Sequence, residues 1–508
     1  MRTRIPFAVL LLIIFLGSTL VFSTPAVSAQ VGCGETITAS TTLNGNLGPC
    51  VGTGLVIGAS GITLNCAKNT IIGTGTGVGV NLTAYTKVKV ENCNAAGFST
   101  GFLLSDASSN TFSKNTADGN GYYGFYVSRS SDSNKLSGNR ANSNNDTGFY
   151  LTSSSSNTLS TDTADSNGFG FVLTNSSGNT LSSNTAASNH LYGIELSSAS
   201  NKNRLSADKA SSNVYGFYVS VSVSNTLSTN TADSNGYGFV LSNSSLNTLT
   251  SNTADKDTDL GIYLTLSSER NTLSKNTASS NDITGFELDD SSNGNKLSGN
   301  TAKSNLDNGF SLAISSGNTL SSNTADKNHY YGFSVAGGSG NTFSKDTADS
   351  NVYGFYLSSS SGNTFSKNTA DKNSYYGFGI GSSTLNTLSG NTASSNAVYG
   401  LLLWSSANST ITGNTADSNI YGFSLSGASG NTLSGNTANK NTFYGFALTG
   451  STGNTLSGNT AKSNKQYGYT DDSTGMGVDG TGNTYSGNIS SGNGLAGSNP
   501  AGLAAPQP

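Results

Sequence analysis

A unit of about 23 residues repeats seventeen times between Asn110 and about Asn493, and this repeat constrains the fold more than any other feature of the chain. One copy, residues 386–407, reads NTLSGNTASSNAVYGLLLWSSA. Fixed periods of this length are typical of solenoids, in which each repeat forms one structural unit and stacks on the next. The chain is therefore expected to form a long array of similar units.

The residue types of the repeat exclude helical solenoids. Asn, Gly, Ser and Thr are poor helix formers, and no apolar stripe of period 3.6 is present. Apolar residues instead alternate with a period of two in the segments NTLS, NTA and GFxL, as in strands with one buried face. The predicted fold class is all-β: a single-stranded parallel β-helix with about 23 residues and three short strands per coil, and about 19 coils.

Corresponding positions of successive repeats form columns. Three apolar columns, which begin at Phe112, Ala117 and Phe125, are predicted to face the interior. An Asn column closes each NTAxxN segment and is predicted to lie at a turn, where Asn tolerates left-handed geometry and stacked amides can hydrogen-bond along the axis. The predicted structural ladder includes Asn120, Asn144, Asn167, Asn281 and Asn305, and Asp257 occupies one position of the same column.

The first 29 residues have the pattern of a signal peptide. Arg2 and Arg4 precede an apolar run, and Val27-Ser28-Ala29 offers a small-residue cleavage site. No later apolar run is long enough to cross a bilayer, so no membrane span is expected after signal removal. The sequence therefore predicts an exported protein, located outside the cell, at the cell surface or in the periplasm.

All four cysteines, Cys33, Cys50, Cys66 and Cys93, precede the regular repeats. Export permits disulfides, and three connectivities are possible. We favour Cys33–Cys50 and Cys66–Cys93, because Cys66 and Cys93 lie about one coil apart. The predicted organisation is a signal peptide at 1–29, a disulfide-stapled cap with irregular first coils at 30–95, β-helix repeats at 96–494, and a flexible tail at 495–508.

The run CGETITASTTLNGNLGPCVGTGLVIGASGITLNC, followed by NTLSxNTAxxNxxYGFxL units, resembles exported right-handed parallel β-helix repeat proteins. It is similar to the β-helix domain of the NosD family, periplasmic copper-binding proteins associated with nitrous oxide reductase. The resemblance implies a right-handed helix. It is specific for the fold and weak for function, because similar coils occur in pectate lyases, epimerases, adhesins and tailspikes.

The copper function that the resemblance implies needs His, Met or Cys ligands. Besides the cysteines, the chain without residues 1–29 offers His190, His329 and Met476. The two histidines follow the same column of the repeat six coils apart, or roughly 29 Å, so they are not expected to share one ion. The copper function is therefore not carried over from the family.

Carboxylates offer weak evidence for catalysis or metal binding. Glu195 and Glu287 occupy equivalent outward positions four coils apart, about 19 Å, which is too far for a paired-carboxylate glycosidase. Glu287, Asp289 and Asp290 form a dense acidic group whose oxygen atoms suit Ca²⁺, although they match no calcium-loop motif. Calcium is the single cofactor considered, and otherwise none is expected.

Tyrosines recur at outward positions. Five of them follow the Phe of the GFxL segment and are predicted to face solvent, where their rings can stack on sugars: Tyr126, Tyr150, Tyr218, Tyr263 and Tyr356. The alternative is an ordinary tyrosine ladder, in which cross-strand aromatic pairs stabilise the sheet. Rows of Thr and Ser in NTLS also resemble ice-binding surfaces, but Lys135, Arg204 and Lys296 interrupt them.

Net charge narrows the class of partner. The formal charge is −4 and no basic stripe is present, which argues against nucleic acid. The sequence favours an exported, non-catalytic scaffold or a surface protein that contacts an extracellular polysaccharide or cell-surface glycan. The alternative is a polysaccharide lyase or epimerase acting in a shallow groove on one sheet. A NosD-like copper-related role and ice binding are weaker hypotheses.

Overall fold

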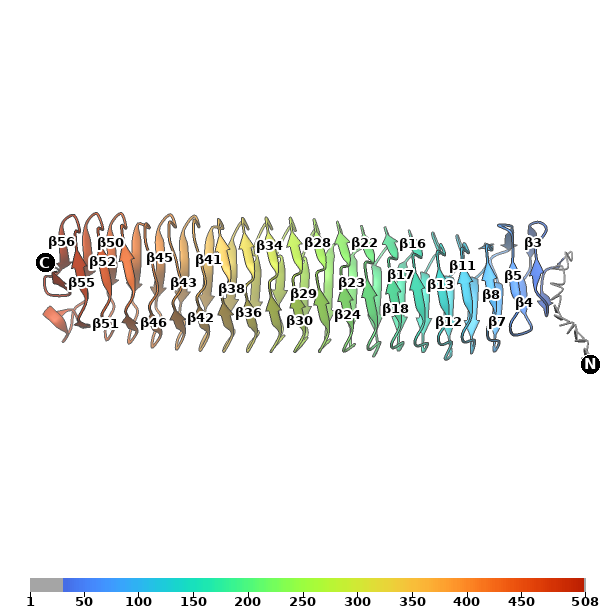
Figure 1. The fold of residues 1–508 in the computed structure, drawn as a ribbon, viewed down its shortest axis with the longest axis horizontal. Coiled ribbons are helices and arrows are strands. Elements are labelled where there is room, and N and C mark those ends of the chain that lie inside the picture. Colours follow the sequence, from blue (N-terminus) through green and yellow to red (C-terminus); the bar gives the residue numbers. More distant parts are fainter. Residues whose placement is uncertain (1–30, 507–508) are drawn as a thin grey trace, which may run out of the picture.

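The computed structural model describes residues 31–506, which form one parallel β-solenoid with its coils stacked along a single axis (Figure 1). It has about 19 turns about 23 residues apart, so the predicted all-β parallel β-helix is confirmed. Within these residues the one helical segment is the short η1 (Val478–Gly480), and no helix is long and apolar enough to span a membrane. The predicted signal peptide, 1–29, lies outside the described residues.

Each coil contributes a strand to the largest sheet, which consists of the GFxL segments and runs the length of the rod. Its 21 strands are β1 (Glu35–Ile37), β4 (Leu55–Ile57), β7 (Val78–Thr83), β10 (Thr100–Ser105), β12 (Tyr123–Ser128), β14 (Thr147–Thr152), β17 (Phe169–Thr174), β20 (Tyr192–Ser197), β23 (Tyr215–Ser220), β26 (Tyr237–Ser242), β29 (Ile262–Thr265), β32 (Phe286–Leu288), β35 (Phe310–Ala313), β38 (Tyr331–Ala336), β41 (Tyr353–Ser358), β43 (Tyr376–Gly381), β45 (Tyr399–Trp404), β47 (Tyr421–Ser426), β50 (Tyr444–Thr449), β53 (Tyr467–Asp471) and β56 (Ala496–Asn499).

The other two segments of the repeat form the remaining sides of the coil. The NTLS segments give three-residue strands such as β11 (Thr111–Ser113) and β13 (Lys135–Ser137), which pair in parallel. The NTA segments give strands such as β16 (Thr163–Asp165) and β19 (Thr185–Ala187). In several coils this third side is reduced to single bridges, for example between Thr116 and Arg140.

The interior is filled by the three apolar columns that the sequence predicts. Equivalent residues of neighbouring coils lie in register, so Phe125 pairs with Phe149 and Phe112 with Leu136. The rings of Phe125 and Phe149 stack with their centroids 4.7 Å apart and their planes 4° apart. These side chains, with Ala117, are fully buried. The thin core is therefore continuous along the axis.

The Gly that precedes Phe in each GFxL strand is required by close packing at one corner. A Cβ atom on Gly148 would lie 2.8 Å from the Cβ of Ala164 and 2.9 Å from the carbonyl oxygen of Gly170. Real Cβ atoms do not approach so closely, so only Gly and Ala together fit where these two sides of the coil meet. This explains why the YGF and NTA motifs recur together.

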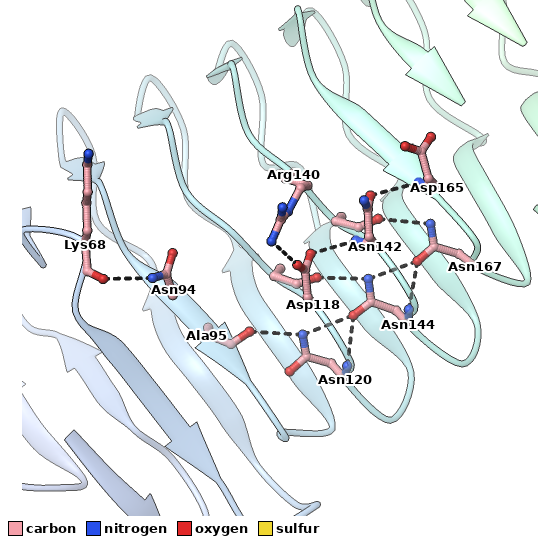
Figure 2. A network of polar contacts seen from close by, with 12 residues as sticks. Lys68, Asn94, Ala95, Asp118, Asn120, Arg140, Asn142, Asn144, Asp165 and Asn167 are labelled. Carbon is pink, nitrogen blue, oxygen red and sulfur yellow. Dashed lines mark hydrogen bonds and ion pairs between the residues drawn. The ribbon is translucent and has the colours of Figure 1, made fainter. Parts of the chain in front are cut away.

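The predicted Asn column forms a buried hydrogen-bonded ladder along the axis (Figure 2). Asn120 Nδ2 donates to Asn144 Oδ1 at 3.0 Å, and Asn144 Nδ2 donates to Asn167 Oδ1 at 3.0 Å. The same Oδ1 of Asn144 accepts the backbone N–H of Asn120, and Asn120 Nδ2 also donates to the carbonyl oxygen of Ala95. Asn281 and Asn305 form the same contact at 2.9 Å. Each amide thus satisfies backbone groups of the neighbouring coils.

The left-handed residue of this turn is not the Asn itself. Positive φ angles occur at the residue before each ladder Asn, for example at Gly119, Ser143 and Ser280. The prediction that the Asn column supplies left-handed geometry is therefore wrong. Asn is needed at this corner for its amide, which both donates and accepts inside the core.

The N-terminal coils are stapled by two disulfides. Cys33 is bonded to Cys50 and Cys66 to Cys93, with Cα–Cα distances of 5.4 and 4.6 Å. This is the connectivity that the sequence favours. At the other end the structure differs from the predicted flexible tail of 495–508, because β56 pairs with β53 and β57 (Ala505–Pro506) pairs with β55 (Ile489–Ser491). The solenoid therefore continues into this segment.

Candidate functional site

The outward side of the 21-stranded sheet, here called the outer face, carries most of the aromatic side chains outside the core. In a regular strand such as β41 the first, fourth and sixth residues are half-buried, whereas the Gly, Phe and Leu between them are buried. Equivalent outward residues of successive coils pair in register, so they form three rows along the axis. Any ligand that lies on this face meets a series of side chains spaced one coil apart, or about 4.8 Å.

The first row consists mainly of the tyrosines that precede the Gly of YGF. Neighbouring rings pack against each other, with centroids 5.1 Å apart for Tyr215 and Tyr237 and for Tyr399 and Tyr421. Burial, followed by the nearby Glu195, raises the pKa of Tyr192 to about 12. These tyrosines form a cross-strand ladder along the sheet.

The five tyrosines predicted to contact glycans lie in the second row and are each half-buried. Tyr126 and Tyr150 are the only members of the set that are paired directly, with stacked rings 5.5 Å apart. The others alternate with different residues, since Tyr263 lies between Val240 and Glu287 and Tyr356 follows Ser334. Rings of the first row cover part of these tyrosines. For example, the ring of Tyr331 is stacked on that of Tyr356, with their centroids 4.5 Å apart. The set faces outward but is less exposed than predicted.

A hollow of about 280 Å³ on the outer face, here called the tyrosine hollow, lies over β38 to β45. It is lined by Tyr331, Tyr353, Tyr356, Tyr375, Tyr376, Leu402 and Trp404. Burial in this cluster, followed by the charge of neighbouring tyrosines, raises the pKa of Tyr376. Tyr356 is thus the one member of the predicted set that lines the tyrosine hollow.

Sequence reasoning missed Trp404, which is the single Trp of the chain. It ends β45, at a position where the neighbouring strands carry Gly381 and Ser426. It also lines a second hollow of about 440 Å³, here called the tryptophan hollow, on the C-terminal side of the first. The repeat alignment contains a signal for this residue, because the single Trp stands in a column that otherwise holds small residues such as Gly381 and Ser426.

Glu287 and Glu195 on the outer face line neither of these hollows, whereas Asp472 lines the tryptophan hollow. Glu287 lies on β32 between Tyr263 and Ser311, half-buried. Burial, followed by the charges of Asp289, Asp307 and Asp259, raises the pKa of Glu287 to about 7. Glu195 lies four strands away, and its pKa is raised by burial. The charges that act on Glu287 are all carboxylates, so the region is electronegative.

The predicted metal ligands Glu287, Asp289 and Asp290 do not converge on one point. Asp289 Oδ1 accepts the backbone N–H of Asp290 at 2.7 Å, and Asp290 Oδ2 accepts the hydroxyl of Thr265 at 3.2 Å. Across residues 31–506 no three His, Cys, Asp or Glu side chains are grouped so that they could hold a metal ion. In the described part of the chain, Glu287, Asp289 and Asp290 therefore do not form such a group.

Comparison with protein families places the fold. The model described as periplasmic copper-binding protein (NosD) matches residues 197–330, 314–432 and 395–500, which together cover more than half of the chain. The chain belongs to the NosD family. A second model, the right handed beta helix region, matches residues 16–164 and 88–232. The right-handed NosD-like β-helix predicted from the sequence is thereby confirmed.

The copper in the NosD family description does not fit the donors of this chain. All four cysteines are in disulfides, so they offer no thiolate. His190 and His329 are exposed and precede β20 and β38, which are six strands apart in the sheet. Met476 is fully exposed beyond β53. Copper prefers imidazole, thiolate and thioether ligands, and these do not gather in the described part of this NosD-family chain.

Solved structures similar to this NosD-family chain include three enzymes. DFA-IIIase from Arthrobacter chlorophenolicus A6 without its lid is 11% identical, with 59% of this chain and 84% of that chain covered and a TM-score of 0.38. A double mutant of the periplasmic alginate epimerase AlgG is 11% identical, covering 74% and 78%, with a TM-score of 0.36. The A-module of Azotobacter vinelandii mannuronan C-5 epimerase AlgE6 is 15% identical, covering 69% and 90%, with a TM-score of 0.34. No curated protein matches the chain.

Proposed function

We propose that this protein is an exported, non-catalytic glycan-binding rod that contacts an extracellular polysaccharide along its outer face. The observation that carries the proposal is the concentration of half-buried tyrosines in two rows of one sheet, with a hollow where they cluster. Aromatic rings provide large, rigid contact area at low entropic cost, and tyrosine adds a hydroxyl that hydrogen-bonds.

The architecture suits an extended ligand better than a compact one. The rows run parallel to the axis and repeat at about 4.8 Å, so a polymer lying along the rod contacts several coils at once. Once one sugar unit of the polymer is bound, the others are held at a high effective concentration near the rod, so many weak contacts together give a higher affinity. The two disulfides in the N-terminal coils support a location in an oxidising compartment, where such polymers occur.

The test is a glycan array probed with the parent protein and with two variants that copy residues from neighbouring coils. Tyr150→Val copies Val172, and Tyr356→Ser copies Ser334, so both variants keep residues that the outer face already accepts. We expect the parent to bind at least one polysaccharide and each variant to bind it about three- to tenfold more weakly. The control is Thr272→Ala on β30 (Thr272–Ser274), which lies on another sheet. Absence of binding to every polysaccharide on the array overturns the proposal.

A second candidate function is a polysaccharide lyase or epimerase, and Glu287 is the observation that favours it. With a pKa of about 7, this carboxyl group is half protonated near neutral pH and is suited to proton transfer. Against it, the charges that act on Glu287 are carboxylates, which repel a uronate rather than neutralise it. Product formation from alginate or pectate that is lost in Glu287→Gln would establish the enzyme in place of the binding protein.

A further inference from the structure

The indole of Trp404 packs over a position of the neighbouring coil that has no side chain. Its register partner on β43 is Gly381, and a Cβ atom there would lie 2.2 Å from Cζ2 of the indole. Gly381 does not have a positive φ angle, so backbone geometry does not demand Gly at this position. The indole itself lies over the glycine, and this requires the absence of a side chain.

The indole also contacts the cluster on its N-terminal side. Its ring is stacked with Tyr356 at a centroid distance of 5.9 Å and an interplanar angle of 12°. Because Tyr356 is on β41 and Trp404 on β45, the indole leans back across β43. One face of the ring is therefore directed at Tyr356. Trp404 also lines the tryptophan hollow, which lies on the C-terminal side of the tyrosine hollow.

The tryptophan hollow begins where the outward residues become small. From Leu402 the second row continues through Ser424, Ala447 and Thr470. From Trp404 the third row continues through Ser426 and Thr449. The loss of side-chain volume after β45 produces the hollow, and the indole stands at its N-terminal end.

The lining combines an aromatic surface with polar groups that can contact hydroxyls. Tyr399, Tyr421 and Tyr444 line the hollow from the first row, and Asp472 contributes an exposed carboxylate. A volume of about 440 Å³ is in the range of sites for small ligands. A hexopyranose has the matching surfaces, since one side of its ring presents C–H groups to an aromatic face and its rim presents hydroxyls. The described lining residues include no Lys or Arg to pair with an acidic sugar.

We propose that the tryptophan hollow is a binding site for a neutral hexopyranose unit that stacks on Trp404. The site deepens the proposed glycan-binding function, on which it rests, by naming the ring that holds a sugar and the charge of that sugar. It also predicts a direction of discrimination: a uronate placed beside Asp472 meets a like charge, so acidic glycans bind this site more weakly.

Because Trp404 is the single Trp, the intrinsic tryptophan fluorescence of the full protein reports on the surroundings of this one indole, which lines both hollows. The experiment titrates the protein with cellohexaose and mannohexaose as neutral probes and with hexagalacturonate as the acidic probe. We expect a saturable change in emission with at least one neutral probe, and about tenfold weaker binding or none for the acidic one. No emission change with either neutral probe, or tighter binding of hexagalacturonate, overturns the proposal.

Two variants test the role of the indole by calorimetry with the neutral probe that binds. Trp404→Ser copies Ser426 of the next strand and should weaken binding by about tenfold or more. Trp404→Phe retains an aromatic face and should restore affinity to within about threefold of the parent. Equal affinity of Trp404→Ser and the parent overturns the site.

The outcome separates this site from the broader function. Polysaccharide binding that survives Trp404→Ser but is lost in Tyr150→Val overturns the tryptophan site and leaves the glycan-binding rod standing, because Tyr150 lies on β14, far along the rod from β45 (Figure 1). Absence of binding to every polysaccharide overturns both.

Discussion

The two sides of the same strands differ in how much they vary from coil to coil. On the inner side, Phe286, Phe310 and Phe333 follow each other in register, with rings stacked 4.7 Å apart. One residue further along each strand, the outer face presents Glu287, Ser311 and Ser334 in the same three coils. Coil-to-coil contacts therefore fix the inner residues. The outer face is free to differ, and its differences are where function is to be sought.

The largest effect is expected on the inner side. Phe310→Ala removes a fully buried ring that stacks between two others and should lower the free energy of unfolding by about 3–5 kcal/mol. Loss of amide protection in hydrogen exchange should centre on the coils around β35, because each coil contacts only its neighbours. Ser311→Ala, on the outer side of the same strand, is the control. Equal effects of the two variants would break the comparison.

The Asn ladder should show the next largest effect. Asn144→Ala removes the acceptor of the Asn120 backbone N–H and of the Asn120 amide, and it leaves the Ala117 carbonyl without its donor. Buried groups that lose their partners cost about 1–3 kcal/mol. Chemical denaturation of the variant measures the loss. Unchanged stability would show that the ladder contributes little beyond the stacked cores.

A pH-dependent effect is expected at Asp257, which replaces Asn in the ladder. The Oδ2 atom of Asp257 faces Gly238, in the same way as the amide nitrogen of Asn281 faces Gly261. This Oδ2 atom has no hydrogen-bond partner. Burial raises the pKa of Asp257 to about 8 from a usual value of 3.8, so the folded protein holds a proton that the unfolded chain releases. Stability contributed by this group is full below about pH 4 and is lost as pH rises towards 8.

Asp257→Asn removes this dependence. The variant should be more stable than the parent at pH 8, by about 1–3 kcal/mol, and the difference should shrink as pH falls towards 4. Thermal melts of the two proteins across this range provide the measurement. A constant difference at all pH values would show that the pKa of this carboxyl group is the same in the folded and the unfolded protein.

The smallest stability effect is expected on the outer face. Tyr126→Ser removes contacts with Tyr123 at 4.9 Å and Tyr150 at 5.5 Å, and cross-strand pairs of this kind contribute about 0.2–1 kcal/mol. Denaturation curves should nearly superimpose on those of the parent. A loss comparable to that of Phe310→Ala would mean that the outer tyrosines are structural, and it would remove the argument that they are kept for binding.

The sequence predicts the parts of this molecule that follow from repetition. The period, the inward Phe, Leu and Ala columns and the Asn ladder all depend on contacts between identical residues of successive coils, and identity is visible in one chain. The favoured pairing of Cys66 with Cys93 also follows from the coil length, because it places them in adjacent coils.

The rest depends on contacts between unlike residues, which repetition does not reveal. The indole of Trp404 fits because its register partner one coil earlier is Gly381. The ring of Tyr331 is stacked on Tyr356 and covers part of it. The left-handed position of the turn falls on Ser143 rather than Asn144, although both residues are common in such turns. The amide of Asn144 is hydrogen-bonded inside the core, and the preceding residue, Ser143, adopts the left-handed conformation that the turn requires.

Except at Asp257, the ladder amides within the rod donate to the next coil and accept from the previous one, so these coils present the same hydrogen-bonding groups at both ends. The coils therefore divide the rod into equal steps, here called graduations, of about 4.8 Å each. Glu287 and Trp404 stand five graduations apart, or roughly 24 Å. Duplication or deletion of one repeat would move them by one graduation, about 4.8 Å, while every junction kept its form. The spacing of surface features can therefore evolve in whole steps, independently of the features themselves.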